Sequence, residues 1–154
     1  MRITIGSTSY DLTTRALVIG VGRYCEGADL VEPEAGAQPA PAPVYASASD
    51  VAGVGRALAA GAGLVRLTHP SHDDLALCAA AGAAVVVPAD VAGDTGLPAD
   101  RVIADTLLVD VTTAEWPAAA TAAGVIRGAR LVRTTDVRGA RRVCDVLAAV
   151  MEAR

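Results

Sequence analysis

Polar side chains follow an apolar run in the last quarter of the chain, an arrangement typical of functional sites in α/β proteins. Residues 129–132 are apolar apart from Arg130, and Arg133, Thr134, Thr135 and Asp136 follow at once, before an amphipathic helical pattern. Residues just beyond the carboxyl ends of parallel strands gather at one edge of a sheet, where such proteins bind their ligands. Residues 133–136 are therefore part of a candidate site.

Other predicted strands end in polar residues of similar kinds. Together the strand-end residues are Glu32, Glu34, Thr68, His69, Asp90, Asp105 or Asp110, Arg133 and Asp136. Carboxylates that face an arginine and a histidine can bind a polar heterocycle or transfer protons. The alternative is structural, because polar residues at strand ends also cap helices and satisfy loop backbone groups.

The chain offers few other reactive groups. His69 and His72 lie three residues apart and, with Asp73, have a spacing compatible with metal ligands. No further ligand with suitable spacing follows, so the sequence predicts no metal site and no bound cofactor. The three cysteines are widely separated, which favours reduced, buried thiols.

Strands and helices must alternate to position these residues. Short aliphatic runs alternate with helical periodicities along the chain, a pattern typical of parallel βα units. The predicted strands are Arg2–Ile5 and residues 29–32, 64–67, 83–87, 101–111 (one long strand or two short ones) and 129–132. About six strands in an α/β fold are too few for a complete eight-stranded barrel, which typically takes ~250 residues.

Helices are predicted between these strands. Residues 10–25 favour a helix capped by Asp11, although a second strand with a short connection fits the same pattern. Other helices are predicted to start after Ser49 or Asp50, after Ser71 and between Thr113 and Pro117, with loops at 35–48 and 90–99. The first loop alternates Pro with Ala, which favours extended backbone.

The last helix has the clearest periodicity. Apolar residues recur every three or four positions, so they are expected to form one buried face. That stripe consists of Ala140, Val143, Cys144, Leu147, Val150 and Met151. The same periodicity predicts that Arg138, Arg141, Arg142 and Asp145 lie in water.

Composition narrows the class of protein. The length of 154 residues predicts one domain over residues 1–154, and the mean hydropathy of +0.42 predicts further apolar burial in an oligomer. No apolar run approaches the ~18 residues of a membrane span, and no signal-peptide pattern is found, so a cytoplasmic location without a membrane partner is expected. A net charge of −4 and 3% aromatic residues argue against nucleic-acid binding.

Four segments resemble those of one enzyme family. Residues 128–137, GARLVRTTDV, are similar to the closing Gly-Ala-x-x-Val-Arg-x-His-Asp-Val segment of dihydropteroate synthases, and residues 26–36, 79–91 and 101–110 resemble further segments of that family in order. The family condenses a pterin pyrophosphate with p-aminobenzoate on a TIM barrel. The resemblance implies a truncated TIM-barrel-like fold, whereas a coincidental likeness would leave an open doubly wound sheet.

The resemblance also implies roles for individual residues. Arg133 would help to hold the phosphate end of the substrate, and Asp105 stands where a pterin-binding Asp is expected. Ala89 replaces the pterin-binding Asn, Thr68 replaces a strand-end Asp, and Thr135 replaces the His. The implied ligand-binding residues are Asp105, Arg133, Asp90, His69, Thr68, Glu32 and Thr135.

The sequence departs from the family at several functional positions. It contains no Lys, so the pterin-contacting lysine of the family's Ser-Arg-Lys-Ser motif is missing, and the Thr-Pro-Asp-Ser-Phe and Ser-Thr-Arg-Pro-Gly loops are missing as well. Each buried polar group left unpaired costs ~1–3 kcal/mol. The expected result is loss of the standard synthase reaction.

Two functional hypotheses remain. The first is a protein that binds a pterin-like small molecule or serves as a partner subunit, either in a homo-oligomer or beside a full-length synthase-like subunit, because open sheet edges need cover. The second is an active transferase of altered specificity, which uses Asp105, Asp90, His69 and Arg133 on a pterin-like or other heterocyclic substrate.

Overall fold

The computed structural model describes residues 1–23, 25–34 and 43–153, and these form two compact units. Unit 1 comprises residues 1–10 and 43–106, and unit 2 comprises the described residues of 11–42 and 107–154. Each unit contains four parallel strands with helices between them, so the predicted α/β class with parallel βα units is confirmed.

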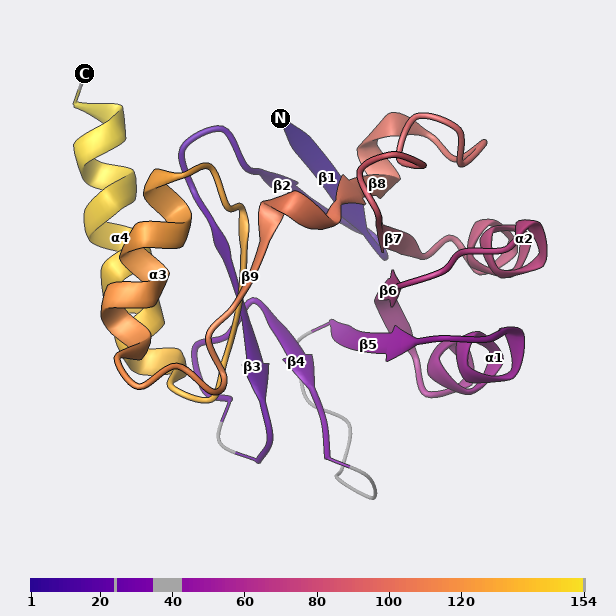
Figure 1. Cartoon of the computed structure of the whole chain (residues 1–154), viewed down its shortest axis with the longest axis horizontal. Helices are drawn as coiled ribbons and strands as arrows, with labels where there is room; N and C mark the ends of the chain where they lie inside the picture. The colour runs from indigo at the N-terminus through magenta and orange to yellow at the C-terminus, as the bar shows by residue number, and fades with distance from the viewer. Residues whose placement is uncertain (24, 35–42, 154) are drawn as a thin grey trace. The chain divides into compact units, whose positions relative to one another are not determined.

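Unit 1 is a parallel sheet in the strand order β8-β7-β6-β5, with α1 and α2 on one face (Figure 1). Its main elements are β5 Val44–Ala48, α1 Val51–Ala59, β6 Ala62–Leu67, α2 His72–Ala81, β7 Ala84–Val87 and β8 Val102–Ala104. Short 3₁₀ helices flank β8, namely η1 Ala99–Arg101 and η2 Asp105–Leu107, and β1 Arg2–Ile5 pairs with β2 Thr8–Asp11 in a separate two-stranded sheet.

Local sequence explains where the helices of unit 1 begin. The Asp50 side chain accepts a hydrogen bond from the Gly53 backbone N–H at 2.6 Å, which caps α1. Ser71 and Asp74 form a capping box at the start of α2. The predicted cap at Ser71 and one of the two alternatives at position 49 or 50 are therefore confirmed.

Residues of unit 1 alternate between the two faces of the sheet. Those facing the helices pack into one apolar core with Val54 and Cys78, and they include Val65, Leu67, Val85 and Val87. The register of the strands then places Tyr45, Ser47, Leu64, Arg66, Ala84, Val86 and Ile103 on the opposite face. Most of these residues are apolar and buried, and Ser47 and Arg66 are the polar exceptions with accessible side chains.

Unit 2 contains four parallel strands in the order β4-β3-β10-β9. Figure 1 shows its two helices, α3 and α4, side by side. Its elements are β3 Leu17–Val21, β4 Leu30–Glu32, β9 Leu108–Asp110, α3 Pro117–Ile126, β10 Leu131–Thr134 and α4 Val137–Glu152. Pro117 occupies the first turn of α3, where its missing N–H costs no helical hydrogen bond.

The same alternation divides the strands of unit 2 into two faces. On the helix side, Val18 and Val132 pack with Val125, Ala140 and Cys144. On the opposite face, the strands carry the buried side chains Leu17, Ile19, Leu30 and Leu131, and further along them Glu32, Asp110 and Arg133. This second face becomes polar only at the carboxyl ends of its strands.

The helix predicted for residues 10–25 is wrong, and the strand alternative is correct. Residues of β3 are buried on both faces, since Val18 packs on the helix side and Leu17 and Ile19 are buried on the other, so no polar alternation marks the strand. Strand β4 pairs directly with β3 in parallel register, and the described residues between the two strands form no helix, with Gly22 and Gly27 at positive φ. Gly20 permits close packing, because a Cβ there would lie 2.8 Å from both Cys25 Sγ and Val137 Cγ2.

Several strand boundaries also differ from the prediction. Residues 44–48, expected within a loop, form β5 because pairing with β6 satisfies their backbone, and the rest of that loop, 35–42, lies outside the described residues. Residues 101–111 contain two short strands, as one alternative predicted. The last strand runs over Leu131–Thr134, so Arg133 belongs to it. The described residues thus hold eight parallel strands rather than about six.

Side-chain exposure corrects the prediction for the last helix and supports that for the cysteines. Arg141 was expected in water, but only 18% of its side chain is exposed, because it pairs with Asp29. Val150, expected in the buried stripe, is 48% exposed. All three cysteines are free thiols, with Cys78 and Cys144 buried. Burial raises the pKa of each of these two thiols to about 11.

No helix in the described residues combines the length and apolar character needed to span a membrane.

Candidate functional site

A compact ion-pair cluster lies at the carboxyl end of the unit 2 sheet. The Arg133 Nε donates a hydrogen bond to Glu32 Oε2 at 2.5 Å, and the Arg133 Nη1 donates to Asp110 Oδ2 at 2.7 Å. The side chains of Arg133 and Glu32 are 21% and 22% exposed, and that of Asp110 is 39% exposed. The cluster is therefore partly desolvated but open on one side.

Strand register explains why these three residues meet. Arg133 on β10 is the register partner of Asp110 on β9, so their side chains share a face. Glu32 lies on β4, one strand beyond β3, and the long Arg133 side chain reaches across β3 to it. The structure thus brings together Glu32, Asp110 and Arg133 from the larger set of strand-end residues that the sequence placed at one edge of the sheet.

Thr112 completes the cluster. Its backbone N–H and its hydroxyl both donate hydrogen bonds to Asp110 Oδ1, at 3.0 and 2.7 Å, and its Oγ1 lies 3.5 Å from Arg133 Nη1. The sequence analysis missed Thr112. A signal was present, because an Asp followed two residues later by Thr is typical of a turn closed by the carboxylate.

The cluster shifts the pKa values of Asp110 and Arg133. Burial alone raises the pKa of Asp110, but the hydrogen bonds from Thr112 and the hydrogen bond and positive charge of Arg133 outweigh it and hold that pKa below its ordinary value. The hydrogen bond to Glu32 raises the pKa of Arg133 against the opposing effect of burial, and Asp110 adds to the rise. Two carboxylates thus surround one permanently charged guanidinium. The three side chains together have a formal charge of −1 at neutral pH.

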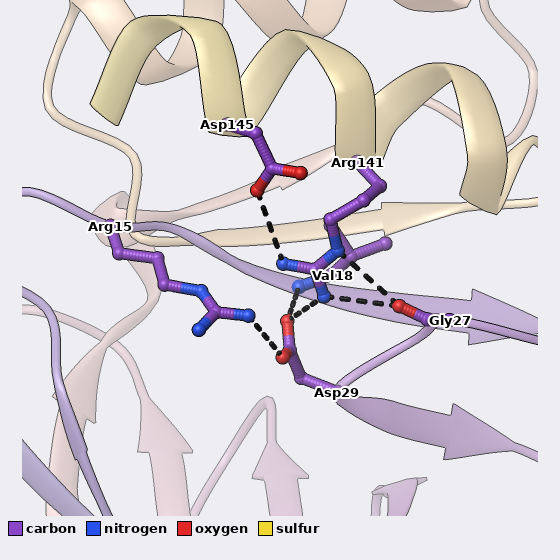
Figure 2. Close-up of polar contacts among 6 residues, drawn as sticks. All are labelled: Arg15, Val18, Gly27, Asp29, Arg141 and Asp145. Atoms are coloured by element: carbon purple, nitrogen blue, oxygen red, sulfur yellow. Dashed lines mark hydrogen bonds and ion pairs between the residues drawn. The ribbon is translucent and has the colours of Figure 1, made fainter. Parts of the chain in front are cut away.

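A second polar network fixes the start of β4, which carries Glu32. Figure 2 shows the Arg141 side chain reaching from α4 to the Asp29 carboxylate, with which it forms an ion pair, and to the Gly27 carbonyl. Arg15 Nη2 also donates to Asp29 Oδ1 at 3.0 Å, and Val18 N donates to Asp29 Oδ2 at 2.8 Å. These bonds tie α4 and β3 to the residue that precedes β4, three positions before Glu32.

Thr135 and Asp136 follow β10 but take no part in the cluster. Both are exposed. Asp136 caps α4, because its Oδ1 accepts a hydrogen bond from the Gly139 N–H at 3.0 Å. For Asp136, the structural alternative considered for strand-end residues is therefore the correct one.

The remaining predicted residues belong to unit 1. Thr68 and His69 follow β6, Asp90 follows β7, and Asp105 follows β8 directly, so all four lie at the carboxyl edge of adjacent parallel strands. The first three are exposed and Asp105 is half-buried. Within the described residues no hydrogen bond or ion pair joins any two of them, and their role in ligand binding stays a prediction.

The geometry defines what the Arg133 cluster can bind. Two of the guanidinium nitrogens already donate to carboxylates, whereas Arg133 Nη2 has no hydrogen-bond partner among the described residues. The carboxylates offer further lone pairs to a donor. Such a cluster suits a neutral or cationic ligand with N–H groups better than an anion. In the described part of the chain, no three His, Cys, Asp or Glu residues are grouped as metal ligands.

Comparison with known proteins identifies the fold. Neither a protein-family model nor a curated protein matches the sequence. Solved structures do match: Yersinia pestis dihydropteroate synthase in a sulfonamide drug complex is 14% identical with a TM-score of 0.75, and the match covers 100% of each chain. Burkholderia cenocepacia dihydropteroate synthase complexed with 7,8-dihydropteroate is 17% identical with a TM-score of 0.73, covering 99% of this chain and 97% of that one.

A third structure leads to the same assignment. Dihydropteroate synthase from Xanthomonas albilineans, in complex with 7,8-dihydropteroate, is 16% identical with a TM-score of 0.74 and coverage of 97% and 98%. The resemblance inferred from four short segments is confirmed at the level of the fold, as is the TIM-barrel-like class. This chain has the α/β fold of the dihydropteroate synthases.

Proposed function

We propose that this protein binds a small heterocycle of the pterin class and does not catalyse the standard dihydropteroate synthase condensation. The observation that carries the proposal is the pairing of Arg133 with Glu32 and Asp110. In the resemblance, this arginine would hold the phosphate end of the substrate. Its engagement by two carboxylates disfavours a pyrophosphate at that place, because like charges repel.

The same cluster favours the amino and ring N–H groups that a pterin presents. Carboxylates are strong acceptors for such donors, and charge-assisted hydrogen bonds are worth about 1.5–3 kcal/mol each. The fold similarity to synthases whose structures contain 7,8-dihydropteroate supports this ligand class. The lack of any Lys in the sequence supports the loss of the standard reaction.

Calorimetric titration with a reduced pterin that lacks a pyrophosphate tests the binding proposal. Saturable binding is expected, and Glu32→Gln should weaken it about tenfold, since one charge-assisted acceptor is lost. Glu34→Gln is the matched control, because Glu34 pairs with Arg23 in an exposed ion pair outside the cluster. A titration without heat, or an equal effect of both substitutions, would refute the proposed ligand site.

An assay with pterin pyrophosphate and p-aminobenzoate tests the second part. No condensation product is expected above the uncatalysed rate. Product formation that requires the protein would instead favour an active transferase, in which Asp105, Asp90, His69 and Arg133 act on the substrate.

A role as a partner subunit is a second proposal, and exposed apolar side chains on unit 2 favour it. Ile126 is 73% exposed at the end of α3, and Val146 and Val150 are 63% and 48% exposed on α4. We propose that these three side chains are covered in a cytoplasmic homo-oligomer or by a full-length synthase-like subunit. Light scattering of the wild type should give at least the mass of a dimer, and the substitution Val146→Glu should reduce that mass. A monomeric wild-type mass at micromolar concentration would contradict the homo-oligomer.

A further inference from the structure

Arg66 is the one charged residue in the four parallel strands of unit 1. It lies in β6, and its neighbours Val65 and Leu67 pack into the core beneath α1 and α2. Because successive strand residues point to opposite faces, Arg66 points to the face opposite these helices. The register places Val86 of β7 beside it on that face, and this valine is fully buried.

Among the described residues, no counter-charge neutralises Arg66. It is half-buried, and in the part of the chain that the structure describes it forms no ion pair or hydrogen bond. The four parallel strands of unit 1 contain no Asp or Glu. Within unit 1, the acidic residue that directly follows one of these strands is Asp105, after β8, and β8 lies two strands from β6, or about 10 Å across the sheet.

A half-buried arginine without a partner lowers the stability of the folded protein. A guanidinium that loses part of its hydration without gaining a partner destabilises the folded state. Charged residues in a sheet interior are normally paired. Arg133 of unit 2, which also lies on the face opposite the helices, follows this rule because it pairs with Glu32 and Asp110. The unpaired Arg66 therefore points to a ligand that supplies the negative charge.

A hydroxyl-bearing residue lies beside Arg66 on the neighbouring strand. Ser47 on β5 is the register partner of Arg66, so the two side chains share the same face, and Ser47 is exposed. Its Oγ donates a hydrogen bond of 3.3 Å to the Tyr45 hydroxyl, a long contact that an incoming acceptor can replace because the hydroxyl rotates. A guanidinium fork beside a hydroxyl matches the geometry of an oxyanion.

We propose that Arg66 and Ser47 form a binding site for the oxyanion group of a small molecule, either a phosphoryl group or a carboxylate. The site rests on residues of unit 1 alone and does not require the proposed pterin ligand of the Arg133 cluster. Arg66 supplies the charge and a bidentate contact, and Ser47 supplies one further donor. The anionic part of a ligand is thus received by Arg66 and not by Arg133.

Anion binding by the full chain tests this site. Inorganic phosphate and benzoate are titrated separately at constant ionic strength, with binding followed by the unfolding midpoint and by calorimetry. At least one of them should raise the wild-type Tm and bind with a Kd in the millimolar range. The arm that responds identifies the phosphoryl or the carboxylate class.

Substitutions locate the binding. Arg66→Gln should weaken it about tenfold or more, and Ser47→Ala by a smaller factor, since a neutral donor is lost. Arg56→Gln is the matched control, because Arg56 is an exposed arginine of the same unit on α1. Without anion, Arg66→Gln should fold with an equal or higher Tm than the wild type, because it removes an unpaired charge. Should that variant fail to fold, Arg66→Lys tests the bidentate contact instead, because it keeps the charge but lacks the planar fork, and it should weaken binding, whereas Arg56→Lys should leave binding unchanged.

Two results would overturn the proposal. The first is the absence of binding of both anions at about 20 mM, because a guanidinium site must reach this range. The second is binding that Arg66→Gln and Arg56→Gln weaken equally, since general charge attraction would then explain it.

Discussion

The Arg133 Nε lies 2.5 Å from the Glu32 Oε2, although the two residues are 101 positions apart in the chain. They come from β10 and β4, which are separated by β3 in the sheet. The ion pair therefore joins two strands that share no backbone hydrogen bonds. It also holds the Arg133 guanidinium at the carboxyl ends of the unit 2 strands, where we propose that the ligand binds.

The substitution Glu32→Gln should lower the free energy of unfolding by about 1–2 kcal/mol, because a half-buried, charge-assisted hydrogen bond is lost. Urea unfolding of the wild type and the variant measures the difference. The control is Glu34→Gln, whose ion pair with Arg23 is exposed and should contribute less than about 1 kcal/mol. Equal losses for the two variants would show that the Arg133–Glu32 pair adds nothing beyond a surface ion pair.

Asp110 should make stability depend on pH in acid. Its pKa is lowered in the folded protein, so its ionised form stabilises the fold above the ordinary value of 3.8, and this contribution is lost as the pH falls through the lowered pKa. Wild type should exceed Asp110→Asn in stability by about 0.5–1 kcal/mol at neutral pH, because the pair is partly exposed. The difference should shrink below pH 3.8. A difference independent of pH from 7 to 3 would contradict the role of the carboxylate charge.

Arg141→Met should destabilise the protein by about 2–3 kcal/mol, since removal of one partner leaves the buried Asp29 carboxylate with less compensation. Arg15 still donates to Asp29 and limits the loss. Chemical denaturation measures the effect. Arg142→Met, at the adjacent exposed position of α4, should change stability by less than about 0.5 kcal/mol. A loss as small as that of the control would mean that the network in Figure 2 does not hold α4 to the start of β4.

Gly20→Ala should lower stability by about 1–3 kcal/mol, because a methyl group there would meet Cys25 Sγ and Val137 Cγ2 at 2.8 Å and overpack the core. The control substitution is expected to change stability in the opposite direction. Gly55→Ala places a methyl group in open space on α1 and should stabilise the protein by about 0.5–1 kcal/mol through helix propensity. Thermal unfolding distinguishes the two, and a neutral Gly20→Ala would show that the close packing of β3 is adaptable.

Local signals in the sequence predicted the elements whose stability is local. The Ser71 capping box involves residues three positions apart, and the start of α3 follows from Pro117, so both could be recognised without knowledge of the fold. Strand β3 could not, because a strand buried on both faces has no alternation and resembles a buried helix segment. Its pairing with β4 and β10, which decides the matter, involves residues remote in the sequence.

The sequence by itself determined the α/β class, the family-like segment at 128–137 and the presence of polar residues at the strand ends. Only the tertiary structure decided which of them meet. Arg133 contacts Glu32 and Asp110, whereas Asp136 caps a helix. Arg141, which the helical periodicity placed in water, forms an ion pair with Asp29. The physical reason is that helical and strand periodicities report burial within one element. Ion pairs between strands depend instead on register and strand order, which non-local contacts fix.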